Sequence, residues 1–218
     1  MTGTTIRVAR KKPDSYQHGD LREALIQAGL KLIADGDAAA LTLRAAAQLA
    51  GVSHAAPYRH FRDKQALVAA IAERGFRQLT AAMREELGRC RSSDSRERLT
   101  SLGLGYARFA THNPASLRVI FGGVLGAAEV PAELTEAADE AYATLRQEIA
   151  DGIECGALRA GDPDQLALAS WSLVHGYSTL LINGAIPRPT TAAAERELVT
   201  ALIKLLGEGL YARTATSA

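Results

Sequence analysis

The residues best suited to chemistry in this 218-residue chain are basic and polar side chains that gather between Thr42 and Lys64. Arginine is the usual bidentate partner of guanine, histidine can also reach a base edge, and alanine methyl groups can touch thymine methyl groups. Cationic and hydroxyl side chains on the same segment suit phosphate, whose contacts set register but carry no sequence information. The candidate DNA contacts are Thr42, Arg44, Ser53, His54, Ala55, Ala56, Tyr58, Arg59, His60 and Lys64.

The segment that must position these side chains reads as two short helices joined by a tight turn. Thr42 is suited to cap a helix that runs to about residue 50, and Gly51 can take the left-handed conformation that ends it. Ser53 is expected to cap a second helix, His54 to His60. Two such helices form a helix-turn-helix, whose second helix enters the major groove; an ordinary helical hairpin with solvated charges is the alternative.

The outward positions divide into two expected roles. His54 and Arg59 are expected to reach base edges, and small residues around them let the backbone approach the duplex. Arg44, Tyr58 and Lys64 are expected to hold phosphates. Asp63 is predicted to cap the following helix, which makes the start of that helix a second anion-binding point.

With Val52-Ser53, Tyr58–Phe61 and Asp63-Lys64 in place, the segment from Leu41 to Leu67 resembles the DNA-binding domain of the TetR family of bacterial transcriptional regulators. The resemblance implies a three-helix N-terminal domain that reads an operator. It also implies a variable helical C-terminal domain that binds a small molecule and dimerises, and a connector helix, Ala66 through Leu87, whose swing changes the separation of the two reading heads.

Composition independently favours an all-α fold. Hydrophobic residues make up 47% and aromatic residues 5%, in runs rich in alanine and leucine with hardly any alternating β-branched stretch. The net charge is only +1, but residues 1 to 64 hold ten Lys and Arg against six Asp and Glu, which leaves −3 for the remainder. The basic end is therefore the end that carries the turn motif.

The same pattern bears on location and cofactors. Cys90 and Cys155 form no metal-ligand spacing, so a reduced interior without a metal or cofactor is expected. No apolar signal region follows Met1, and a cytoplasmic protein is expected. The run from Gln165 to Pro187 carries no formal charge over 23 residues, but its polar residues favour burial in a helical bundle over a membrane.

The predicted organisation follows the chain. A basic tail over residues 1–15 is expected to be disordered and either solubilises the protein or reaches a minor groove. The expected domains are a DNA-binding domain over 16–64, a connector helix over 65–92, an effector-binding and dimerisation domain over 93–213, and a short tail over 214–218. Gly103-Leu104-Gly105 is not a nucleotide loop, because position 108 is Arg and no strand precedes it.

The centre of the second domain is a helix from Pro163 to about Asn183, apolar nearly all round. Its Trp171 and Val174-His175-Gly176 resemble the tryptophan and histidine-glycine signature of one TetR subgroup. Pockets are mostly apolar with a few placed polar groups, so an apolar or aromatic effector is expected. The candidate ligand contacts, each of which could instead belong to the core, are Tyr106, Phe109, His112, Phe121, Trp171, His175 and Tyr177.

The last helix, about Thr191 to Tyr211, carries two adjacent apolar rows, wider than one small domain needs to cover. Paired with the preceding helix across a two-fold axis it would form a homodimer, which also suits a palindromic operator. A hydrolase is not expected, since no GxSxG elbow is present. The expected function is that of a repressor that binds a palindromic operator as a dimer and is released by a small, mainly apolar ligand. The open alternatives are a ligand-dependent activator and a helical DNA-binding or adaptor protein without an effector.

Overall fold

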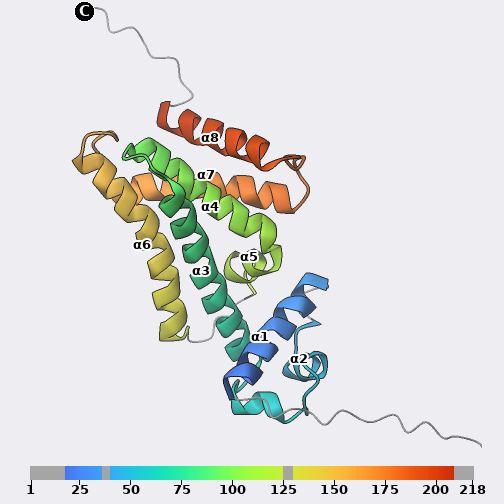
Figure 1. Cartoon of the computed structure of the whole chain (residues 1–218). Helices are drawn as coiled ribbons and strands as arrows, with labels where there is room; N and C mark the ends of the chain where they lie inside the picture. The colour runs from blue at the N-terminus through green and yellow to red at the C-terminus, as the bar shows by residue number, and fades with distance from the viewer. Residues whose placement is uncertain (1–17, 36–39, 125–129, 209–218) are drawn as a thin grey trace, which may run out of the picture.

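The structure is a computed structural model that describes residues 18–35, 40–124 and 130–208; these ranges are helical and contain no strand. The all-α prediction is confirmed. The elements are α1 (His18–Asp35), α2 (Leu43–Leu49), the short 3-10 helix η2 (Ala56–Arg59), α3 (Lys64–Arg89), α4 (Ser95–His112), α5 (Pro114–Phe121), α6 (Ala132–Glu154), α7 (Pro163–Ile182) and α8 (Ala192–Glu208). Figure 1 shows α1 and α2 at one end, α7 and α8 at the other, and α3 running between them.

The N-terminal end is built from α1, α2 and η2. Thr42 caps α2 as predicted, its hydroxyl oxygen accepting from the Ala45 N–H at 3.0 Å, and Gly51 has the expected positive φ of 70°. In α1, Leu25 and Ala28 are buried. Ile26 and Ile33 are also buried, because α1 contacts α2, α3 and α5 and is therefore covered on more than one face.

The long helix α3 connects the two ends. Asp63 caps it as predicted, accepting from the Ala66 N–H at 2.8 Å. Large apolar residues recur along one face of α3; the first four are buried and the last is partly buried, and in order they are Leu67, Ile71, Leu79, Met83 and Leu87. Because α3 contacts α1 as well as α4, α5 and α6, one continuous core extends from the N-terminal helices into the C-terminal ones.

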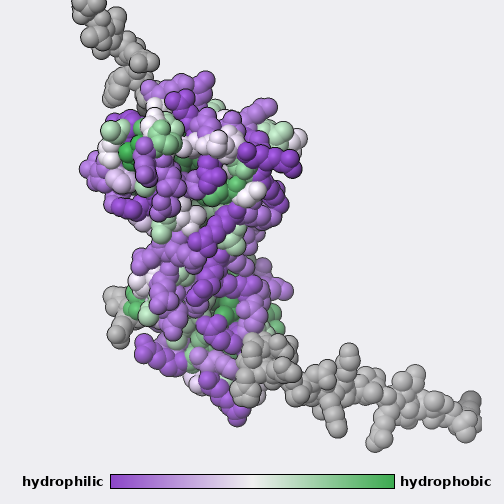
Figure 2. Space-filling model, turned by 60° about the vertical axis from the view of Figure 1, so that its left-hand side comes forward, coloured by the Kyte–Doolittle hydropathy of each residue, from purple (hydrophilic) through white to green (hydrophobic). Residues whose placement is uncertain are grey.

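Helix-breaking and helix-capping residues separate the helices of the C-terminal half. Asn113 and Pro114 separate α4 from α5, and Gly156 follows α6 with φ 77°. Asp162 caps α7, its carboxylate accepting from the Asp164 N–H at 3.0 Å. The surface in Figure 2 is largely hydrophilic and forms two lobes joined by a narrower waist.

Several predicted segments fall outside the described residues: the tails over 1–15 and 214–218 and the first two residues of the DNA-binding domain expected over 16–64. The domain boundaries stay predictions, although α3 begins at Lys64 and ends at Arg89. In the described part of the chain, no helix combines the length and apolar character needed to cross a bilayer.

Candidate DNA-reading surface and aromatic cluster

The predicted DNA contacts form one surface at the end of the molecule that carries α2 and η2 (Figure 1). Seven of the ten side chains are exposed, and the other three, Ala56, His60 and Lys64, are partly buried. Tyr58 is 61% exposed although aromatic, which suits a ring that meets a phosphate or sugar. The Thr42 oxygen caps α2, and its O–H remains to donate to a phosphate. The contacts themselves remain predictions.

The second helix of the turn motif is shorter than predicted. Instead of a helix from His54 to His60, the chain forms the four-residue 3-10 helix η2, and the Ser53 side chain does not cap it. The Ser53 carbonyl, not its hydroxyl, accepts from the Ala56 N–H at 3.0 Å. The reason is Pro57: without an N–H it cannot make the first backbone bond of a helix that starts at His54, so the helix starts two residues later.

A cluster of aromatic rings lies where α4, α5 and α7 meet. The Phe121 ring centroid lies 5.5 Å from that of Trp171 and 4.8 Å from that of His175. The Tyr106 hydroxyl and His175 Nδ1 share a hydrogen bond of 2.7 Å. His175 Nε2 lies 3.4 Å from the Thr179 hydroxyl. The cluster is therefore apolar with a short polar chain through its histidine.

Burial shifts the ionisation of both polar rings in this cluster. Removal from water raises the pKa of the Tyr106 phenol well above its usual range, because the phenolate loses its hydration. The same effect lowers the pKa of His175, because imidazolium is the charged form of that ring. Both groups are therefore neutral at pH 7, and their shared hydrogen bond joins two uncharged partners.

Four of the seven predicted ligand contacts, Tyr106, Phe121, Trp171 and His175, belong to this cluster. Phe109 is buried in the continuous core that also contains Tyr106. Tyr177 is buried in a second, smaller core with residues of α4 and α8. His112 is exposed, and its Nδ1 donates to the Arg108 carbonyl at 2.8 Å. Whether any of the seven contacts a ligand remains a prediction.

Two members of the cluster escaped the sequence reasoning. Phe76 of α3 meets the Phe121 ring edge-on at 5.6 Å, and Tyr142 of α6 lies 6.3 Å from Trp171. Phe76 lies within the predicted connector and Tyr142 within the domain expected over 93–213, and no local pattern marks either residue as part of a site. Their place in the cluster depends on α3 packing against α5 and on α6 packing against α7, which are tertiary contacts.

Comparison with known proteins matches both halves of the chain. Residues 25–71 match the family model described as bacterial regulatory proteins, tetR family, and residues 99–206 match that of the tetracyclin repressor-like C-terminal domain. The second match includes Trp171 and the Val174-His175-Gly176 segment. The chain is also 29% identical to the nucleoid occlusion factor SlmA of Marinobacter nauticus. That alignment extends over 140 residues, which is 64% of this chain and 70% of SlmA.

Solved structures agree over nearly the full length. A protein of unknown function from Rhodococcus sp. RHA1 is 31% identical and superposes with a TM-score of 0.76 over 90% of this chain and 98% of that one. The transcriptional regulator FadR from Bacillus subtilis, solved with stearoyl-CoA, is 16% identical with a TM-score of 0.71, covering 87% of this chain and 99% of that one. At that identity the likeness concerns the fold alone. With a family model matched at each end, the chain belongs to the TetR family of bacterial regulatory proteins.

Proposed function

We propose that this protein acts as a homodimeric transcriptional repressor that binds a palindromic operator and is released by a small, mainly apolar ligand. The observation that carries the proposal is the pairing of two surfaces at opposite ends of α3. At one end lie the exposed helix-turn-helix side chains, and at the other lie exposed leucines of α7 and α8. A regulator of this kind acts on the chromosome, which places it in the cytoplasm.

The dimer is proposed from the leucines that α7 and α8 leave exposed. They are Leu168, Leu180, Leu198, Leu205 and Leu206, each 40% exposed or more. They lie on two helices that contact each other, and large exposed apolar patches mark protein interfaces. Pairing α7 and α8 with their symmetry mates would cover these side chains in a four-helix arrangement. Two reading heads about 34 Å apart could then bind successive major grooves of one duplex.

The effector site is proposed at the aromatic cluster. Rings from α3, α4, α5, α6 and α7 offer flat apolar surface, and the Tyr106–His175 pair offers one place for a polar group of the ligand. FadR, whose structure has the same fold, was solved with stearoyl-CoA, a ligand with a long apolar chain. Because the cluster consists of uncharged rings, the part of a ligand that it contacts should be apolar or aromatic.

A direct route leads from this cluster to the DNA end. Phe121 ends α5, and its ring contacts Phe76 of α3. One residue earlier on each helix, Gly75 allows such a close approach that an added Cβ would lie 3.1 Å from Ile120. A ligand that moves Phe121 would therefore displace α3 as well, and DNA affinity would fall by the ligand's differential affinity for the two conformations.

A second candidate function is DNA binding without a small-molecule effector. It is favoured by the relative named a nucleoid occlusion factor, whose 29% identity extends over 64% of this chain. An activator rather than a repressor would share the same reading surface. The three candidates differ in what a ligand does. It releases a repressor from DNA, it has no effect on a DNA-binding protein without an effector site, and it increases transcription when the protein is an activator.

Fluorescence anisotropy with DNA from upstream of the protein's own gene tests the proposal, using a scrambled duplex as control across a salt series. We expect tight binding to the native duplex, two protomers per palindrome, and weak binding to the scrambled one. Equal weak binding to both duplexes would refute the proposed regulator.

A further inference from the structure

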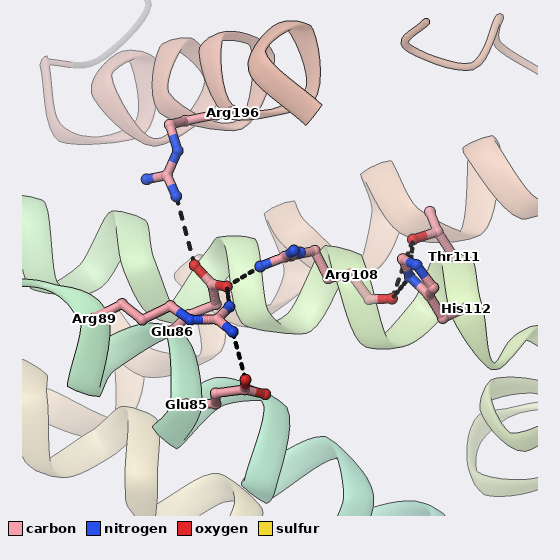
Figure 3. A network of polar contacts seen from close by, with 7 residues as sticks. All are labelled: Glu85, Glu86, Arg89, Arg108, Thr111, His112 and Arg196. Atoms are coloured by element: carbon pink, nitrogen blue, oxygen red, sulfur yellow. Dashed lines mark hydrogen bonds and ion pairs between the residues drawn. The ribbon is translucent and has the colours of Figure 1, made fainter. Parts of the chain in front are cut away.

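A buried carboxylate lies where α3, α4 and α8 meet. The Glu86 side chain of α3 is only 4% exposed, and its Oε1 accepts from Arg89 Nη1 at 2.5 Å and from Arg108 Nη1 of α4. Its Oε2 lies 3.5 Å from Arg196 Nη2 of α8. Figure 3 shows the three guanidinium groups converging on this one carboxylate, while Arg89 also reaches Glu85. Glu86 thus interacts with a residue on each of the other two helices.

Loss of these ion pairs would cost the buried Glu86 carboxylate more than it would cost the three exposed arginines. The three arginines are 43–59% exposed, so water solvates them and each exposed pair alone contributes little. The carboxylate is buried and must keep its donors, because an unpaired buried charge is strongly unfavourable. Its burial is therefore compatible only with positions of α4 and α8 that keep Arg108 and Arg196 within reach.

Two glycines of α4 allow the same three helices to pack closely against one another. A Cβ on Gly103 would lie 2.8 Å from Ile203 Cδ1 of α8, and one on Gly105 would lie 2.6 Å from the Ala82 carbonyl oxygen of α3. The Gly103-Leu104-Gly105 motif thus allows close packing, because Gly103 faces α8 and Gly105 faces α3 without a side chain between the helices. Arg108 lies one helical turn beyond Gly105, which puts the ionic cluster beside this contact.

We propose that Glu86 is a positioning residue for operator binding: its carboxylate fixes the angle of α3 to α4 and α8 and so sets the separation of the reading heads. The proposal rests on the proposed dimer and operator. Glu86 lies 22 residues after Lys64, where α3 begins beside the reading surface, which amounts to about 33 Å of helix. A change of about 5° at Glu86 would therefore move that end by about 3 Å, close to the rise of one base pair.

Glu86→Gln tests this role, because it keeps the volume and removes the charge. Glu148→Gln is the matched control: Glu148 of α6 is 8% exposed and accepts from Arg98 Nε and Nη2 of α4 at 2.7 and 2.6 Å. It ties α4 to α6, whereas Glu86 ties α3 to α4 and α8. Arg196→Gln cuts only the contact to α8 and covers the case in which Glu86→Gln fails to fold.

The first readout is the ratio of affinities for the operator and for duplexes whose half-sites lie one base pair closer or further apart. We expect wild type to prefer its native spacing by about fivefold or more, and Glu86→Gln and Arg196→Gln to reduce that preference to within about twofold. Glu148→Gln should keep the wild-type ratio even if its stability falls. An unchanged ratio in Glu86→Gln, or an equal loss in Glu148→Gln, would overturn the proposal.

The second readout needs no DNA. Spin labels on a cysteine introduced at exposed Gln48, with Cys90 and Cys155 replaced by serine, report the distance between the two reading heads of the dimer. We expect a broader distribution in Glu86→Gln and a wild-type distribution in Glu148→Gln. Identical widths would refute the role of Glu86 even if wild type binds its operator. A wild type that shows this distance but binds no operator would refute the proposed function instead.

Discussion

Replacing Gly105 by alanine should separate α3 from α4. An alanine Cβ at this position would lie 2.6 Å from both the Ala82 carbonyl oxygen and Met83 Cα, where ordinary contact begins at 3.4 Å. Both atoms belong to the backbone, so no side-chain rotation relieves the overlap. The two helices must therefore move apart by about 0.8 Å, and a close-packed interior resists such a shift.

The expected cost follows from two opposing terms. Overpacking of this kind destabilises by about 1–3 kcal/mol. Alanine is better than glycine inside a helix by roughly 0.5–1 kcal/mol, which offsets part of that cost. We expect a net loss of about 1–2 kcal/mol, or a fall in Tm of roughly 2–8 °C for a chain of this size.

Two other glycines provide graded controls in the same helix pair. Gly88 of α3 has nothing within 4 Å of an added Cβ, so Gly88→Ala should raise Tm by roughly 1–4 °C. Gly103→Ala would meet only the tip of Ile203, which can rotate, and should fall between the two. Thermal unfolding at one fixed protein concentration measures all three, since dimerisation makes Tm depend on concentration. If Gly105→Ala were as stable as Gly88→Ala, the close approach of α3 and α4 would be refuted.

The other predictions concern DNA, assembly and pH. Arg44→Ala should weaken binding to operator and random DNA alike and reduce the slope of log K against log salt concentration by about 0.9. Arg59→Ala should instead relax operator specificity. Equal losses on both duplexes for Arg59→Ala would contradict its base-reading role. Leu205→Glu should yield monomers by light scattering, while Val130→Glu, at an exposed apolar position two residues before α6, should remain dimeric. His175 has a native pKa below its unfolded value of about 6.5, so the unfolded state binds the proton first as pH falls. The free energy of unfolding should therefore decrease from about pH 6.5 downward, and His175→Gln should flatten that decrease in denaturant titrations at several pH values.

The parts of the fold that sequence reasoning predicted are those settled within a few residues. The hydroxyl of Thr42 and the carboxylate of Asp63 each cap a helix by accepting from a backbone N–H three residues further along the chain. Gly51 supplies a positive φ that few other residues adopt. The same local logic placed a cap at Ser53 and was wrong there. Pro57 acts at the same range and removes the backbone N–H that a helix from His54 would need.

The site features that the sequence did not reveal depend on which helices become neighbours. Phe76 looked like one more apolar residue of a connector until α5 brought Phe121 to its ring. Glu86 and Arg108 are separated by 22 positions and lie on different helices, so neither charge pattern nor spacing pairs them. The Gly103-Leu104-Gly105 motif could be rejected as a nucleotide loop, but its packing role required the positions of α3 and α8.

The proposed function requires α3 both to hold a reading head and to respond to the aromatic cluster, and its contacts suit both roles. At its N-terminal end α3 shares a core with α1, so the head moves with the helix. In its middle, Phe76 and Gly75 face the end of α5, where a ligand would act. At its C-terminal end, Glu86 and the Gly105 contact hold α3 to α4 and, through Arg196, to α8. A helix fixed at one end and displaced at its middle must move most at its other end, which is the end that would meet DNA.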